Sequence, residues 1–143
     1  MILSSIAIVA YVAAALLLAR YFTKDETQHR HQQTTSLLIS LAIIAQALNF
    51  TDFWVAEGIV FGLANSASFV AWLIAILLFL SSISKPVHAL GILVYPLAAI
   101  TLIFSIIFPD TAGKVIPMSL ASHVFLSITA YALLALAVCQ SVL

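Results

Sequence analysis

The sequence predicts an all-α membrane protein, a polytopic bundle of about five transmembrane helices. Hydrophobic residues make up 64% of the 143 residues and charged residues only 7%, whereas soluble domains have about 45–50% and about 25%. So few charged side chains cannot cover the surface of a soluble protein of this length. In a bilayer the same scarcity is expected, because a charged side chain in the hydrocarbon core is costly.

Five apolar runs each have about the 20 residues that a membrane-spanning helix needs. None shows the alternation of polar and apolar residues that marks a strand of a membrane barrel. Short loops join the runs and hold nearly all the charge, so residues 1–143 are expected to form a single transmembrane domain. The predicted helices cover about residues 2–22, 36–54, 63–83, 87–108 and 119–143.

The basic residues predict the orientation, because short cytoplasmic loops are enriched in Lys and Arg. Four of the five basic residues lie in the first and third loops or at the edge of the first loop. The second and fourth loops contain only one basic residue, Lys114. We therefore predict an N-terminus outside and a C-terminus in the cytoplasm. The four residues on the cytoplasmic side are Arg20, Lys24, Arg30 and Lys85. A cleaved signal peptide is the alternative for residues 2–22, but this run lacks the basic N-terminal region of such a signal.

Composition and motifs exclude several classes of function. The net charge is zero and the basic residues are scattered, so nucleic-acid binding is not expected. The single cysteine, Cys139, excludes an internal disulfide and a cysteine-built metal site. Phosphate-binding loops, zinc-protease motifs, nucleophile elbows and paired carboxylates are absent from the sequence. We therefore expect no enzymatic activity.

His123 is the most informative polar residue in a predicted membrane segment. Helical spacing places Ser127 and Tyr131 on the same face, and Pro117 with Ser119 is expected to start the helix, the serine hydroxyl capping it. A neutral imidazole in this place can ligate haem iron. The alternative, and the commoner role, is a histidine hydrogen-bonded to a neighbouring helix.

Other intramembrane polar residues have simpler predicted roles. Gln46 and Asn49 are expected to hydrogen-bond to neighbouring helices. Asn65, Ser66 and Ser68 are expected to cap the third helix rather than to contact a ligand.

The remaining aromatic, proline and histidine residues are also given simple roles. Phe50, Phe53 and Trp54 are expected to form an interfacial belt rather than a platform for haem, and Pro96 is expected to kink the fourth helix. The other three histidines, predicted to be solvated, are His29, His31 and His88.

The stretch SHVFLSITAYALLALA, residues 122–137, resembles the cytochrome c assembly proteins of the CcsA type. The resemblance rests on His123, Val124, Ser127, Tyr131 and Ala132. The upstream stretch FGLANSASFVAWL, residues 61–73, resembles the outer loop of that family and the start of the helix that follows. The YpjD/HemX-like branch, multi-pass proteins of the bacterial inner (plasma) membrane, is the most similar.

The resemblance implies an inner-membrane component of cytochrome c assembly that binds or presents haem at the outer side. His123 would be an axial ligand of the haem iron, with no other metal, and Gln46 stands where many relatives have a histidine. Lys114, the one basic residue on the outer side, is the candidate contact for a haem propionate. Besides the lipid bilayer, the implied partners are other cytochrome c assembly proteins and apocytochrome. Relatives are longer, so we expect the chain to be the N-terminal part of a longer protein.

The alternative function is a small-solute transporter or a structural membrane subunit without haem. Short loops, a helix containing proline and polar residues within the membrane favour it. An inverted repeat and an acidic or basic residue in the middle of the membrane, which transport would favour, are not found in the sequence.

Overall fold

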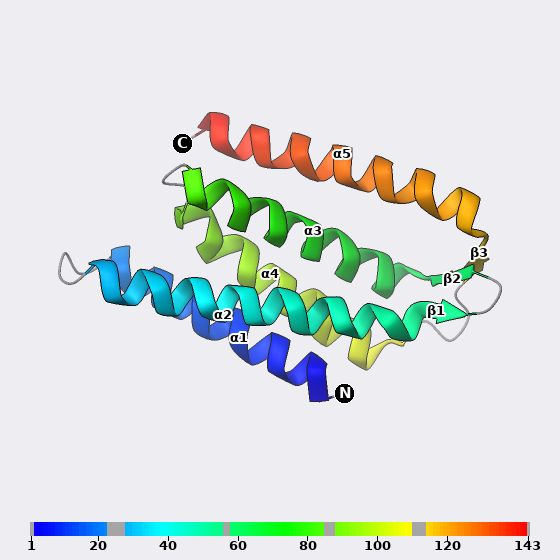
Figure 1. Cartoon of the computed structure of the whole chain (residues 1–143), viewed down its shortest axis with the longest axis horizontal. Coiled ribbons are helices and arrows are strands. Elements are labelled where there is room, and N and C mark those ends of the chain that lie inside the picture. Colours follow the sequence, from blue (N-terminus) through cyan, green and yellow to red (C-terminus); the bar gives the residue numbers. More distant parts are fainter. Residues whose placement is uncertain (1, 23–27, 56–57, 85–87, 110–113, 143) are drawn as a thin grey trace.

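Five long helices whose axes run side by side form the structure (Figure 1). The computed structural model describes residues 2–22, 28–55, 58–84, 88–109 and 114–142. The predicted all-α bundle of about five helices is confirmed. The helices are α1 (Ile2–Phe22), α2 (Gln28–Asn49), α3 (Leu63–Ser84), α4 (His88–Ile107) and α5 (Met118–Val142).

Small residues fill the interior of the bundle, and large apolar residues cover its outside. Large exposed side chains include Ile2, Val9 and Leu93, which are 80%, 68% and 70% exposed. This distribution suits lipid, in which large apolar side chains are solvated and small ones let helices approach closely. The alanines in the main buried cluster are Ala7, Ala10, Ala14, Ala15, Ala42, Ala45, Ala71, Ala75, Ala98 and Ala99.

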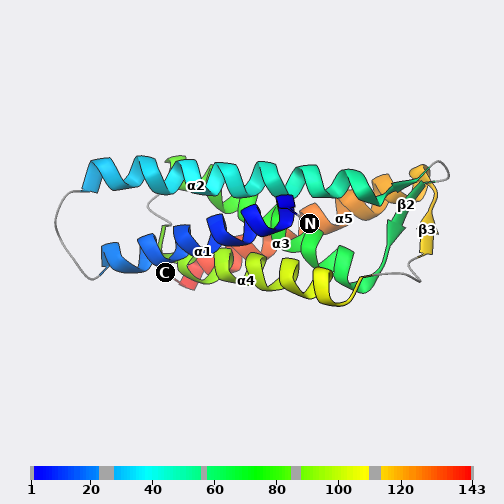
Figure 2. The ribbon, with the colours of Figure 1, turned by 90° about the horizontal axis from the view of Figure 1, so that it is seen from below.

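Within the described residues, four helices are long and apolar enough to cross a membrane, namely α1, α3, α4 and α5. In α2 the apolar part, Gln33–Asn49, is shorter than a full span. The whole of α2 nevertheless runs alongside the bundle (Figure 2), because its polar first turns extend the same helix. The chain is therefore a multi-pass membrane protein by the length and composition of its helices.

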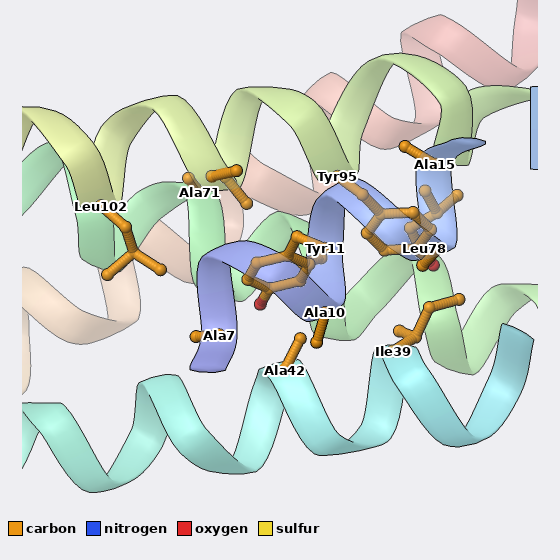
Figure 3. Packing of buried hydrophobic residues seen from close by; sticks show 14 of the residues in the cluster. Ala7, Ala10, Tyr11, Ala15, Ile39, Ala42, Ala71, Leu78, Tyr95 and Leu102 are labelled. Atoms are coloured by element: carbon orange, nitrogen blue, oxygen red, sulfur yellow. The ribbon is translucent and has the colours of Figure 1, made fainter. Parts of the chain in front are cut away.

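The helices pack in a chain of neighbours. α1 lies between α2 and α4, α3 packs on α4 and α2, and α5 packs on α3 at the edge of the bundle. In the core, the rings of Tyr11 and Tyr95 stack with their centroids 6.0 Å apart (Figure 3). Gly91 leaves room for this stack, since a Cβ there would lie 2.6 Å from Cε2 of Tyr95.

The prediction of a helix over residues 36–54 was wrong at both ends. α2 begins at Gln28, and so includes His29 and His31, which were predicted to lie in a loop. It ends at Asn49 and is followed by a 3-10 helix, Phe50–Phe53. Hydropathy marks only the part of a helix that lies in lipid, whereas Gln and Arg are good helix formers that extend it into water. The other four helices begin and end within one residue of the prediction.

Three short strands close one end of the bundle, here called the strand end. They are β1 (Trp54–Val55), β2 (Gly58–Phe61) and β3 (Lys114–Ile116). They form an antiparallel sheet in the order β1-β2-β3, with Ile59 opposite Ile116. Through strand pairing, the sheet joins the segment between α2 and α3 to the segment between α4 and α5. The sequence predicted loops at these positions, so the sheet is a correction.

The five helices alternate in direction, so α1 begins towards the strand end and α5 ends at the opposite end (Figure 1). Arg20 lies in the last turn of α1 and Arg30 near the start of α2, both at the end opposite the strands. Lys24 and Lys85 lie outside the described residues. The N-outside orientation, which depends on these four basic residues, stays a prediction.

Candidate functional site

The start of α5 determines where its polar residues lie. The carbonyl of Pro117 accepts hydrogen bonds from the backbone N–H groups of Leu120 and Ala121, at 2.9 and 3.0 Å. Ser119 was predicted to cap the helix, but the helix begins at Met118, so Ser119 lies within the first turn. The Pro117 carbonyl therefore accepts the first hydrogen bonds of α5, as the residue that precedes a helix does.

His123 lies on the side of α5 that faces away from the bundle. Ala121, Ala132 and Leu136 are buried towards α3, whereas His123 is exposed. A separation of two residues from Ala121 places His123 on the opposite side of a helix with 3.6 residues per turn. Among the described residues, no hydrogen bond or ion pair to the imidazole is found. The alternative role, a histidine bonded to a neighbouring helix of this chain, therefore has no partner in the described part.

Ser127 and Tyr131 lie near the same outward side. Tyr131 is 74% exposed and Ser127 is half-buried. Both are within the membrane-spanning stretch Ser119–Val138. The outward side of α5 is therefore an apolar surface with three polar residues, of which His123 is nearest the strand end.

Aromatic rings hold α5 on α3. The ring of Phe125 meets the edge of Phe69 at a centroid distance of 4.5 Å and an angle of 89°. Phe69 also lies against Phe50 and Trp72, at 5.4 and 5.7 Å. Phe50 is thus half-buried against α3, and its place in an interfacial belt stays a prediction. The side chains of Phe53 and Trp54 lie outside the described part.

A hydrogen-bonded network lies in the core, with Gln46 at its centre. Gln46 is completely buried. Its Oε1 accepts a hydrogen bond from the hydroxyl of Tyr11 at 2.8 Å, and its Nε2 donates to the carbonyl and the hydroxyl oxygens of Ser68, both at 3.1 Å. One amide thus links α1, α2 and α3. The predicted hydrogen bonds of Gln46 to other helices are confirmed, whereas Ser68, predicted to cap α3, instead accepts from Gln46.

Two further hydrogen bonds join helices near the strand end. Ser4 donates to Oδ1 of Asn49 at 3.0 Å, which confirms the predicted role of Asn49. The indole N–H of Trp72 donates to the carbonyl of Ile43 at 3.0 Å. Within the described part of the chain, Thr35 Oγ1 is the only buried side-chain nitrogen or oxygen without a hydrogen bond. The other buried side-chain nitrogens and oxygens of the described residues each have at least one hydrogen-bond partner.

The structure separates the four histidines. His123 lies near the strand end, whereas His29 and His31 are in the first turn of α2 and His88 begins α4, all at the other end. Among the described residues, no group of three or more His, Cys, Asp and Glu could hold a metal ion. Lys114 starts β3, at the same end as His123. Among the described residues, a site at His123 would therefore start from one imidazole nitrogen, with the backbone of Lys114 at the same end.

The residues around His123 fit one side of a haem. Its imidazole makes no bond to another described residue, so its nitrogen can approach an iron atom. Leu126 and Ala130, one and two turns further along α5, are exposed and offer an apolar surface for the macrocycle. If haem binds here, His123 is the described residue whose imidazole would ligate the iron.

Comparisons with models of protein families, with characterised proteins and with solved structures find no match to this chain.

Proposed function

We propose that this chain is a haem-handling component of cytochrome c assembly in a bacterial inner membrane, and that His123 presents an axial ligand at the outer side. The observation that carries the proposal is the exposed imidazole within a membrane-spanning helix, without a hydrogen bond to the other described residues. An ionisable side chain turned towards lipid is costly, and such residues mark functional sites in membrane proteins. The resemblance of residues 122–137 to the CcsA-type family supports haem as the ligand.

Each nearby residue has a distinct role in this proposal. Haem iron accepts an imidazole nitrogen as an axial ligand. The helix start at Pro117 fixes the height of His123 near the strand end, and the exposed apolar surface of Leu126 and Ala130 excludes water from one side of the ring. Lys114 offers a cation for a propionate, a contact of about 0–1 kcal/mol if it is exposed to water. From its position at the membrane edge, His123 would present the haem to apocytochrome or to another assembly protein.

We expect His123→Ala to abolish the Soret absorbance of bound haem in the haem-loaded protein. The protein would be purified in mild detergent, loaded with haemin and titrated spectroscopically. His29→Ala, His31→Ala and His88→Ala should keep the absorbance, because these residues lie at the opposite end of the bundle. Ser122→Ala, an exposed neighbour of His123, is the matched control. External imidazole should restore the spectrum of His123→Gly.

The unfolding midpoint of the haem-free protein distinguishes two roles of His123, that of a haem ligand and that of a hydrogen-bond partner of a neighbouring helix. Since the imidazole makes no bond to the described residues, His123→Ala should leave this midpoint unchanged. A spectrum that survives His123→Ala would refute the assignment of the ligand. A parent protein that never binds haem would instead favour the transport or structural alternative.

A further inference from the structure

The start of α5 is attached to the rest of the bundle on either side of His123 in the sequence. Before His123, β3 pairs with β2, and only Pro117 separates β3 from α5. After His123, the ring of Phe125 contacts Phe69 of α3. His123 therefore lies between two points of attachment, although its own side chain is exposed.

The strand pairing determines how far α5 lies along the bundle. Each of the two paired strands is one residue away from a helix, since Gly62 joins β2 to α3 and Pro117 joins β3 to α5. A slip of the pairing by one residue would move the start of α5 by about 3.4 Å relative to β2. The helix α5 also contacts β2 directly. The sheet thus sets the depth of His123 in the membrane.

The contact between Phe125 and Phe69 determines the rotation of α5 about its own axis. The two rings meet edge to face at a centroid distance of 4.5 Å, and Phe69 is 7% exposed. Ala121 lies on the same side of α5 as Phe125, four residues earlier, and is also buried. His123 is midway between Ala121 and Phe125 in the sequence, so it lies on the opposite side of the helix. With Phe125 held against α3, the imidazole points outward.

The remainder of α5 is attached separately, towards the other end of the bundle. Beyond Phe125, the buried residues in the described part of α5 are Ala132 and Leu136. Leu136 lies about 20 Å further along the helix than His123, at a rise of about 1.5 Å per residue. A substitution of Leu136 can therefore loosen α5 without changing the attachment near His123.

We infer that Phe125 is a positioning residue for His123, because its edge-to-face contact with Phe69 holds the imidazole on the outward side of α5 at the depth set by the strand pairing. The inference rests on the proposed function, in which this imidazole ligates haem iron. A side chain that is already held in its binding direction loses less conformational freedom when it binds, so the contact should strengthen haem binding. Phe125 acts through His123, since its own ring faces α3.

A nitroxide label beside His123 tests the positioning without haem. Ser122 is exposed and would carry the label as Ser122→Cys in a Cys139→Ser background. Phe125→Leu removes the ring but keeps an apolar side chain, Phe125→Tyr keeps the ring, and Leu136→Ala loosens the other end of α5. Electron paramagnetic resonance in proteoliposomes should show about twofold faster motion of the label in Phe125→Leu, and the motion of the parent in the other two variants. Equal motion in Phe125→Leu and Leu136→Ala would overturn the inference.

Haem titration of the same variants connects the positioning to the proposed function. Phe125→Leu should weaken haem binding about tenfold, whereas Phe125→Tyr and Leu136→Ala should stay within about twofold of the parent. Equal weakening by Phe125→Leu and Leu136→Ala would show that haem binding follows stability alone. This result, or unchanged binding in Phe125→Leu, would overturn the inference and leave the proposed function standing. A parent protein that binds no haem would refute the proposed function, and the motion of the label would then decide whether Phe125 positions His123.

Discussion

Replacing Phe69 by alanine is expected to loosen α5 from the bundle and to lower the free energy of unfolding by about 3 kcal/mol. Phe69 is 7% exposed, and its ring contacts Phe50, Trp72 and Phe125. Its removal leaves a cavity between α3 and α5 and removes the edge-to-face pair that joins these helices. Lipid solvates an apolar side chain in the unfolded reference state, so we place the effect at the low end of the range for soluble cores.

Unfolding in mixed micelles with increasing dodecyl sulfate would measure the loss, and the fluorescence of Trp72 would report on the cavity. Phe104→Ala is the matched control. Its ring lies 4.9 Å from Phe108, but Phe104 is 39% exposed and this pair lies on the outside of α4. We expect a change below about 0.5 kcal/mol for this variant. Equal losses for Phe69→Ala and Phe104→Ala would contradict the role given to the aromatic cluster.

Gln46→Leu is expected to lower the free energy of unfolding by about 2 kcal/mol. Leucine removes three hydrogen bonds and leaves the buried hydroxyl of Tyr11 without an acceptor. A buried unpaired polar group costs about 1–3 kcal/mol, and hydrogen bonds between membrane helices contribute up to about 1.7 kcal/mol. The variant should also weaken the attachment of α2 to α3, since the two helices share few other polar contacts in the described part.

A double-mutant cycle identifies the network as the cause. Tyr11→Phe should destabilise the parent by about 1 kcal/mol but should add little in the Gln46→Leu background, because the acceptor is already gone. Ser40→Ala is the control, since its hydroxyl bonds only to the carbonyl of Ser36 within α2. Additive losses for Tyr11→Phe and Gln46→Leu would show that the two side chains act separately.

The helices could be predicted from the sequence because lipid requires long apolar runs, and both ends of four of the five helices follow from the ends of those runs. The polar first turns of α2 could not be predicted from the sequence, because no apolar pattern marks them as helical. The sheet was missed because its strands are only two to four residues long, and because β2 pairs with β3 across the whole of α3 and α4. Short pairings between distant segments have no local signal.

The polar residues show a similar division. Hydrogen bonding of Gln46 to other helices was predictable, because an amide in lipid needs partners. The partners of Gln46 could not be predicted, because Tyr11 and Ser68 come from two other helices, α1 and α3. The rotation of these helices about their axes depends on packing. The exposure of His123 also depends on packing, because the sequence does not tell which side of α5 meets α3.

The central claim is that His123 lies at the outer side of a multi-pass membrane bundle, and cysteine labelling tests it most directly. Thr51 is exposed near the strand end, and Gln33 is exposed in the part of α2 nearer the opposite end. Thr51→Cys and Gln33→Cys, each in a Cys139→Ser background, would be treated in intact cells with a membrane-impermeant thiol reagent. The account predicts labelling of Thr51→Cys in intact cells and of Gln33→Cys only after permeabilisation. Labelling of Gln33→Cys alone in intact cells would place His123 on the cytoplasmic side and contradict the account.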